Sequence, residues 1–239
     1  NIAIGLQAGG AITTADNNIA IGADALLAAT TAAGNTGIGT NALRTLTTGN
    51  SNVAIGTSSM YSNTTGTLNT AIGVSSLYAN TTASHNTGLG YNTLNATTTG
   101  ANNVAVGSSA AAANTTGASN TIIGRNAGMT ATTVSGNTAV GDNALKLNVA
   151  EYNTAVGAFA MDTNTTGTTC TAVGYAALDA NSTGSHNTGI GAYALVANTT
   201  GAANVALGKG AGAGITTGSR NIAIGYNTYD ASDTENDNI

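Results

Sequence analysis

Short apolar segments recur along the whole chain at a fixed spacing. Each has the form N-x-A-I-G, with an aliphatic residue in fourth place and glycine in fifth, as in residues 52–56 and 153–157. The spacing is 17 residues, with one exception of 16, and the closing glycines are Gly5, Gly22, Gly39, Gly56, Gly73, Gly90, Gly107, Gly124, Gly141, Gly157, Gly174, Gly191, Gly208 and Gly225. Residues 1–239 therefore form a single repeat array: fourteen copies, one single-residue deletion near Glu151, and the start of a fifteenth copy. Because solenoids need caps, we expect the array to be part of a longer chain.

The repeat length and its alternation predict an all-β fold. Seventeen residues are too few for a helix-turn-helix unit, which takes more than about 30. They suit one coil of a parallel β-solenoid, or β-roll, with two short strands and two turns. The N-T-A-I-G segment alternates with period two, which is typical of a strand, and the N-T-T-G segment has the side chains of a turn.

The alternation also predicts which side chains face inward. The fourth position is aliphatic in every copy, so we expect it to line the coil interior, together with leucine at the ninth position. Members of the expected interior ladder are Ile4, Ile21, Ile38, Ile55 and Ile72. The third position then faces outward, and its small residues indicate close approach of another backbone. We expect these residues to face partner chains of a homotrimer: Ala54, Ala71, Ala105, Ala155 and Ala172.

Composition and charge exclude several classes of function. Only 6% of the residues are charged and the net charge is −5, against roughly 25% charged residues in typical soluble proteins. The five basic residues are scattered, which argues against nucleic acid as a partner. No apolar run is long enough to span a membrane. A single cysteine, Cys170, excludes an intrachain disulfide.

The repeated motif resembles the head repeats of YadA-like trimeric autotransporter adhesins, and the longer pattern with N-T-T-G is similar to repeats of phage-type tail fibres. Residues 52–56 (N-V-A-I-G) and 153–157 (N-T-A-V-G) carry the likeness. The resemblance implies a homotrimeric parallel β-roll in an extracellular, cell-surface or virion fibre. It also implies that surface glycans or proteins of a host cell are candidate partners. The adhesin head repeat is usually shorter, so this coil has a longer outer turn.

Few residues are candidates for chemistry. His85 and His186 both take the last place of the repeat and lie about 29 Å apart at ~4.8 Å per coil, too far to share a metal within one chain. Cys170 replaces the first-position Asn, which favours a buried thiol. An acidic group near the end, Asp230, Asp233, Glu235 and Asp237, is interpreted as a solvated coil. We therefore expect no catalytic, cofactor-binding or metal-binding residues, and no enzyme.

Two sets of polar or aromatic residues leave alternatives open. Tyrosines between the motif glycine and the turn either contact sugars or proteins, or pack over the alanine-rich surface; they are Tyr61, Tyr78, Tyr91, Tyr175, Tyr193, Tyr226 and Tyr229. Asparagines that begin N-x-[ST] sequences are either glycan acceptors or turn residues, and turn chemistry explains them; they are Asn63, Asn80, Asn95, Asn114, Asn164, Asn181 and Asn198.

The sequence thus predicts a structural or adhesive segment, a shaft or head, of a surface fibre. The alternative is an ice-binding solenoid, suggested by threonine columns such as Thr14, Thr31 and Thr48. An ice-binding face needs outward residues at alternate strand positions, and these threonines belong to adjacent pairs that point to opposite sides of a strand. We therefore interpret the threonine pairs as turns.

Overall fold

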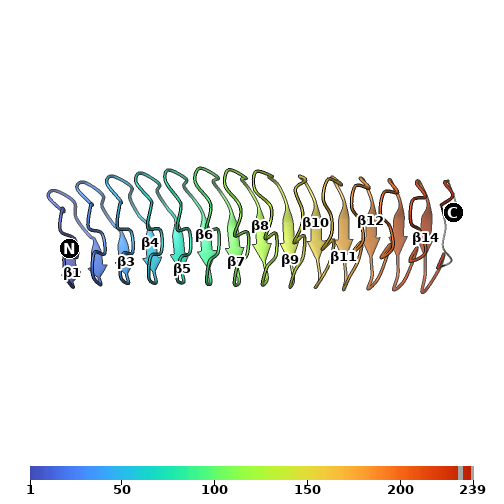
Figure 1. The fold of residues 1–239 in the computed structure, drawn as a ribbon, viewed down its shortest axis with the longest axis horizontal. Helices are drawn as coiled ribbons and strands as arrows, with labels where there is room; N and C mark the ends of the chain where they lie inside the picture. The colour runs from blue at the N-terminus through green and yellow to red at the C-terminus, as the bar shows by residue number, and fades with distance from the viewer. Residues whose placement is uncertain (231–233, 238–239) are drawn as a thin grey trace. The chain divides into compact units, whose positions relative to one another are not determined.

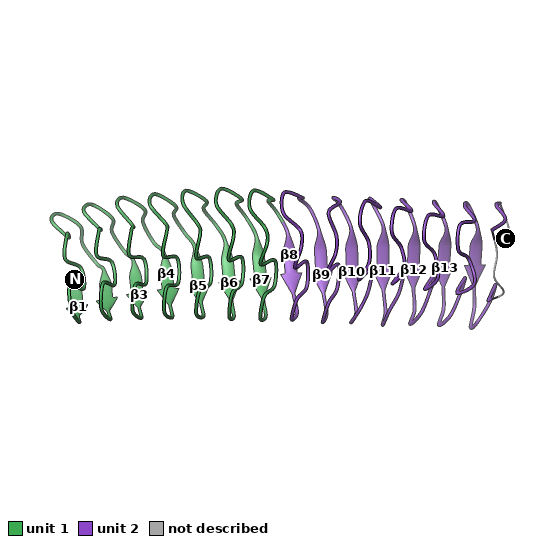
Figure 2. Cartoon of the chain, viewed as in Figure 1, with its two compact units in different colours: residues 1–119 green, residues 120–239 purple. Residues whose placement is uncertain are grey.

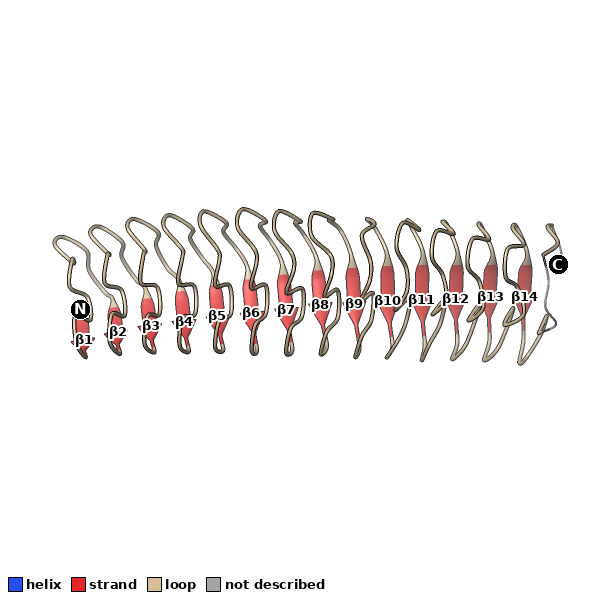
Figure 3. Cartoon of the chain, in the orientation of Figure 1, coloured by secondary structure: helices blue, strands red, loops and turns tan. Residues whose placement is uncertain are grey.

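The computed structural model describes residues 1–230 and 234–237, in which each repeat contributes one three-residue strand (Figures 1 and 3). The chain divides into two compact units, residues 1–119 and residues 120–239 (Figure 2). Unit 1 contains β1 (Ile2–Ile4), β2 (Ile19–Ile21), β3 (Thr36–Ile38), β4 (Val53–Ile55), β5 (Thr70–Ile72), β6 (Thr87–Leu89) and β7 (Val104–Val106). Unit 2 contains β8 (Thr121–Ile123), β9 (Thr138–Val140), β10 (Thr154–Val156), β11 (Thr171–Val173), β12 (Thr188–Ile190), β13 (Val205–Leu207) and β14 (Ile222–Ile224).

Within each unit the strands pair in parallel and in chain order, so the predicted β-solenoid is confirmed. Equivalent repeat positions are register partners: Ala54 pairs with Ala71, and Ile55 with Ile72. The 16-residue repeat keeps this register, because Val140 of β9 still pairs with Val156 of β10. The deletion is therefore absorbed outside the strands.

The prediction of two strands per coil is wrong for the described residues, which contain one strand per coil. The opposite side of the coil, at repeat positions seven to eleven, is a run of turns. Positions seven and nine have positive φ there, as at Asn41 (61°) and Leu43 (53°). Backbone hydrogen bonds still join successive coils on this side, for example from the N–H of Leu43 to the carbonyl of Ser59 at 3.1 Å. Alternating left-handed residues break the strand but preserve the stacking.

The predicted orientation of the strand is also wrong. The third-position residues are the inward ones: Ala54, Ala71, Ala105, Ala155 and Ala172 are all completely buried. The fourth-position residues Ile4, Ile21, Ile38, Ile55 and Ile72 lie on the outer face, partly or largely exposed. The small alanines thus face the coil's own interior rather than solvent or another chain.

The reason for this orientation is the narrowness of the coil. The ninth-position side chain, as predicted, is fully buried in most coils, for example Leu43 and Leu77. One leucine per coil fills the space opposite the strand, which leaves room only for alanine or glycine at the third position. Close packing penalises both voids and overlaps.

Exceptional coils show the same volume limit. In β8 the third position holds Ile122, and the ninth position of that coil is Gly128; a Cβ there would lie 3.2 Å from Ile122 Cδ1. In the coil of β13 the ninth position is Gly212, and Ile215 fills the interior three residues later. Loss of the leucine is matched in each case by a larger side chain nearby.

The fifth-position glycine is required by the backbone. At Gly39 φ is 129°, and a Cβ would lie 2.7 Å from the carbonyl carbon and oxygen of Gly56 in the next coil. L-residues avoid this φ, and no side-chain movement relieves an overlap with backbone. This explains why the fifth position is glycine in every copy.

A pair of glycines two residues apart provides a test. Gly39→Ala should lower the free energy of unfolding by at least about 2 kcal/mol, since backbone strain and a clash with the next coil add. Gly37→Ala is the matched control. Residue 37 has an ordinary φ, and the added Cβ would contact Leu26 Cγ at 3.3 Å. This substitution should therefore change the free energy of unfolding by no more than about 1 kcal/mol. Chemical denaturation of both variants compares them, and equal effects would contradict this account.

Candidate functional site

A ladder of first-position asparagines closes and stacks the coils. The Asn35 Oδ1 accepts the backbone N–H of Asn52 at 2.9 Å, and the Asn35 Nδ2 donates to the carbonyl of Gly49 in its own coil at 3.0 Å. The Asn52 side chain makes the same pair of bonds with Asn69 and Gly66. Each amide therefore links one coil to the next and the end of a coil to its beginning, in a fully buried site.

Cys170 interrupts this ladder in unit 2. It is buried, and its thiol donates to the carbonyl of Gly184 at 3.3 Å, in the place of the asparagine Nδ2. Burial raises the pKa of the thiol, and the backbone amides of Asn187 and His186 lower it in part. The N–H of Asn187 thus faces sulfur, a weak acceptor, instead of an amide oxygen. The thiol is held neutral inside the coil, as expected from the sequence, and is not placed as a nucleophile.

Restoring the consensus at this position should stabilise unit 2. Cys170→Asn supplies an Oδ1 acceptor for Asn187 and should raise the free energy of unfolding by about 1 kcal/mol, the net contribution of one hydrogen bond. The reverse change in the same column, Asn204→Cys, should lower it by a similar amount. Thermal unfolding of both variants measures the effect, and a destabilised Cys170→Asn protein would contradict the role assigned to the ladder.

A second amide ladder runs through the twelfth position. In unit 2 the Nδ2 of Asn181 donates to Asn164 Oδ1 at 2.8 Å, and Asn198 to Asn181 Oδ1 at 2.9 Å. The Oδ1 of Asn198 is buried and unpaired, because the next coil has Ile215 in this column. Six of the seven asparagines of N-x-[ST] sequences are buried in these ladders, namely Asn63, Asn80, Asn114, Asn164, Asn181 and Asn198. Their amides hold turns together and are not accessible to a glycosyl transferase in the folded chain.

The threonine pairs lie in bends, as the sequence predicted. The first threonine of a pair donates its hydroxyl to the next coil, for example from Thr47 Oγ1 to the carbonyl of Thr64 at 3.0 Å. The second, such as Thr48, is exposed. A single exposed column is not the two-rank face that an ice lattice requires.

In each unit, the outer face of the strands is an apolar surface. We call the second and fourth repeat positions the outer stripe. Its fourth-position members are, in unit 1, Ile4, Ile21, Ile38, Ile55, Ile72, Leu89 and Val106, and in unit 2, Ile123, Val140, Val156, Val173, Ile190, Leu207 and Ile224. Ile72 and Val156 are each 36% exposed and Leu207 is 48% exposed. Extended apolar surfaces of this kind mark interaction sites.

The second rank of the outer stripe is aliphatic or threonine. Five successive strands of unit 2 carry threonine there, namely Thr121, Thr138, Thr154, Thr171 and Thr188. No charged residue occurs at either rank. The stripe therefore offers a flat, uncharged array of methyl groups and hydroxyls at the ~4.8 Å spacing of strands.

The tenth position forms a second outward column, on the turn side. In unit 1 the rings of Tyr61 and Tyr78 stack at 5.2 Å, and Arg44 donates to the Tyr61 hydroxyl at 3.0 Å and pairs with Asp24 at 3.4 Å. Tyr78 stacks on Tyr61, and Tyr61 contacts the arginine. Neither ring packs over the third-position alanines, which are inside the coil. Exposed pairs of this type add little stability.

In unit 2 the same column contains Lys146, Asp162 and Asp179. Partial burial raises the pKa of Asp162, with Lys146 lowering it and Asp142 raising it. Partial burial, and then the charge of Asp162, raises the pKa of Asp179. Because the folded state holds protons more tightly than the unfolded chain, the free energy of unfolding falls as pH rises from about 3.9, the ordinary Asp value, through the raised pKa.

Removing one of these carboxylates tests the sign of this effect. Asp162→Asn should melt at a higher temperature than the wild type at pH 7, and the difference should disappear as the pH falls well below about 3.9, where the carboxyl is protonated in both states. Asp237→Asn is a control of opposite sign, since Arg220 lowers the pKa of Asp237. Melting curves across this pH range that show no gain for Asp162→Asn would refute the assignment.

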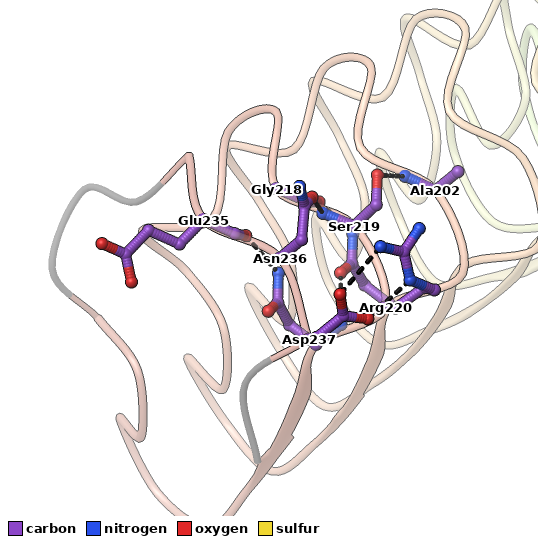
Figure 4. Close-up of polar contacts among 9 residues, drawn as sticks. Ala202, Gly218, Ser219, Arg220, Glu235, Asn236 and Asp237 are labelled. Atoms are coloured by element: carbon purple, nitrogen blue, oxygen red, sulfur yellow. Dashed lines mark hydrogen bonds and ion pairs between the residues drawn. The ribbon is translucent and has the colours of Figure 1, made fainter.

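The remaining described candidates lie in turns or in contacts between coils. His85 and His186 are exposed at turns with φ of 61° and 62°. Asp237 pairs with Arg220 at 2.8 Å, and the carbonyl of Glu235 accepts from Asn221, so both extend the coil stacking (Figure 4). Asp233 lies outside the described residues. In the part of the chain that the structure describes, no three His, Cys, Asp or Glu side chains are grouped so as to hold a metal ion.

Comparison with protein-family models, with curated proteins and with solved structures finds no match to this chain. The described residues include no helix long and apolar enough to cross a bilayer. The outer stripe is thus the feature on which a functional assignment rests.

Proposed function

We propose that this chain is a structural and adhesive segment of an extracellular fibre, a shaft or head on a cell or virion surface, in which three copies pack through their outer stripes. The observation that carries the proposal is the outer stripe itself. Aliphatic side chains that the narrow coil cannot accommodate are repeated on one face of every strand, without an interrupting charge. Covering this face with other copies would remove it from water, at about 25 cal/mol per Å² of apolar area.

The repeat supports self-association in particular. A face that repeats every coil is complementary to the same face on another copy, since both have the same spacing. The number three follows from the resemblance of the N-x-A-I-G motif to trimeric adhesin heads. In such an assembly the turn side stays outward and offers weak, repeated polar contacts to glycans or proteins of a host surface, so binding would depend on multivalency.

Charge substitutions in the outer stripe test the assembly. We expect the wild type to sediment as a trimer, and Ile72→Lys or Val156→Lys to dissociate it, because an unpaired charge buried between chains costs several kcal/mol. Thr65→Lys, in the exposed turn column, is the matched control and should leave the trimer intact. Ala105→Arg would not test contacts between chains, because Ala105 is buried inside its own coil.

The outcome that contradicts assembly is a monomeric wild type whose sedimentation none of these changes affects. Circular dichroism verifies that the lysine variants keep their fold, as expected for side chains that point away from the interior.

A second candidate function is ice binding through the same face. The observation in its favour is the column of second-position threonines in β8–β12. These threonines and the fourth-position aliphatic residues are outward residues at alternate strand positions, which is the arrangement that an ice-binding face needs and that the threonine pairs in the turns lack. A monomer with thermal hysteresis that Val156→Lys abolishes would favour ice binding over the fibre. A trimer without hysteresis would favour the fibre.

A further inference from the structure

Three aromatic rings lie in successive coils of unit 2, immediately beyond the fifth-position glycine. We call Phe159, Tyr175 and Tyr193 the aromatic ladder. The ring centres of Phe159 and Tyr175 are 5.9 Å apart, and those of Tyr175 and Tyr193 are 5.3 Å apart, both edge to face. The N–H of Tyr193 donates to the carbonyl of Tyr175 at 2.9 Å, so the coil stacking fixes the ring spacing.

Two of these residues occupy a backbone position that does not suit them. Phe159 and Tyr193 take the seventh position, with φ of 60° and 62°. Bulky residues disfavour this left-handed region. Other coils place small, amide or acidic side chains there, as at Gln7, Asp24, Asn41, Ser58, Ser75, Asn92, Ser109, Asn126, Asn143 and Asn227. The ninth-position leucines, such as Leu195, have the same left-handed backbone but fill the coil interior; the interior does not explain a bulky side chain at the seventh position, which points outward.

Phe159 is partly buried, whereas the two tyrosine rings are more exposed. Tyr175 is 47% exposed and Tyr193 is 43% exposed. Neither hydroxyl has a hydrogen-bond partner among the described residues. The rings therefore present apolar faces and free hydroxyls to solvent, beside the outer stripe and not within it.

We infer that the aromatic ladder is a binding platform for a linear, uncharged saccharide chain. Aromatic rings with a polar edge suit ligands that are apolar on one face and hydroxylated at the edge, as pyranose rings are. A sugar unit in an extended β-linked chain advances by about as much as one coil, ~4.8 Å, so successive sugars can follow successive rings.

Charge and area distinguish this ligand from others. The Nζ of Lys209, in the coil that follows Tyr193, lies over the Tyr226 ring at 5.6 Å. The described residues place no cation over the rings of the ladder, which favours an uncharged ligand over an acidic one. A fully covered aromatic residue buries about 150–250 Å². Less than half of each tyrosine is exposed, so the ladder offers on the order of 200 Å². A stable protein interface needs about 800 Å² per partner.

The test titrates the full chain with cellohexaose and chitohexaose by calorimetry. The wild type should bind at least one of these probes, and Tyr175→Ala or Tyr193→Ala should weaken that binding about three- to tenfold, as expected for loss of one stacked ring. Tyr91→Ala is the matched control, since Tyr91 is an isolated, exposed tyrosine in the same column as Tyr175, and its affinity should equal that of the wild type.

Tyr193→Asn separates binding from folding. Asparagine tolerates the left-handed backbone, so this variant should melt at or above the wild-type temperature while its saccharide affinity falls as in Tyr193→Ala. The proposal is overturned if the wild type binds neither probe, or if Tyr193→Asn binds as tightly as the wild type. It is also overturned if the ladder substitutions dissociate the assembly and leave saccharide binding unchanged, which would make the ladder a contact between chains. Assembly through the outer stripe is measured by sedimentation, so the two proposals fail separately.

Discussion

Opposite the strand, each coil has space for one large apolar side chain, and much of the structure follows from this limit. The ninth-position leucine takes the space, so the strand opposite presents alanine or glycine inward. Its aliphatic residues must then face outward, which creates the outer stripe. A coil this thin cannot be stabilised by its hydrophobic interior alone. Buried amide ladders and backbone bonds between coils supply much of what a larger core would otherwise provide.

The amide ladders and the fifth-position glycines both depend on close stacking of the coils. A Cβ at the fifth position would overlap the backbone of the next coil, and an asparagine at the first position spans the gap between coils with its Oδ1. Both need the coils to lie at strand spacing. Variation is greater at outward places, and the charged and aromatic columns of the turns differ between the two units.

The repeat, the strand position and the parallel stacking could be predicted from periodicity, and so could the burial of the ninth-position leucine. Which face of the strand points into the coil could not be predicted. Alternation shows that two sets of side chains face opposite ways, but it does not show which set is inside. Assigning the larger residues to the interior fails when a leucine from the other wall already fills it. The pair of Ile122 and Gly128 contained the signal, since an exchange of volume between the third and ninth positions indicates that both columns face one interior. The aromatic ladder was visible only as scattered tyrosines, because the sixth and seventh positions become neighbours only when the coils stack.

The first-position asparagine ladder has a direction. Each Oδ1 accepts from the N–H of the coil that follows it in the chain, as Asn35 accepts from Asn52 and Asn52 from Asn69. A chain emerging from the ribosome would therefore find, for each new coil except the one that follows Cys170, an amide acceptor on the coil before it. Such a solenoid can be completed turn by turn during synthesis, each finished coil serving as the template for the next, without waiting for the carboxyl-terminal end to be made.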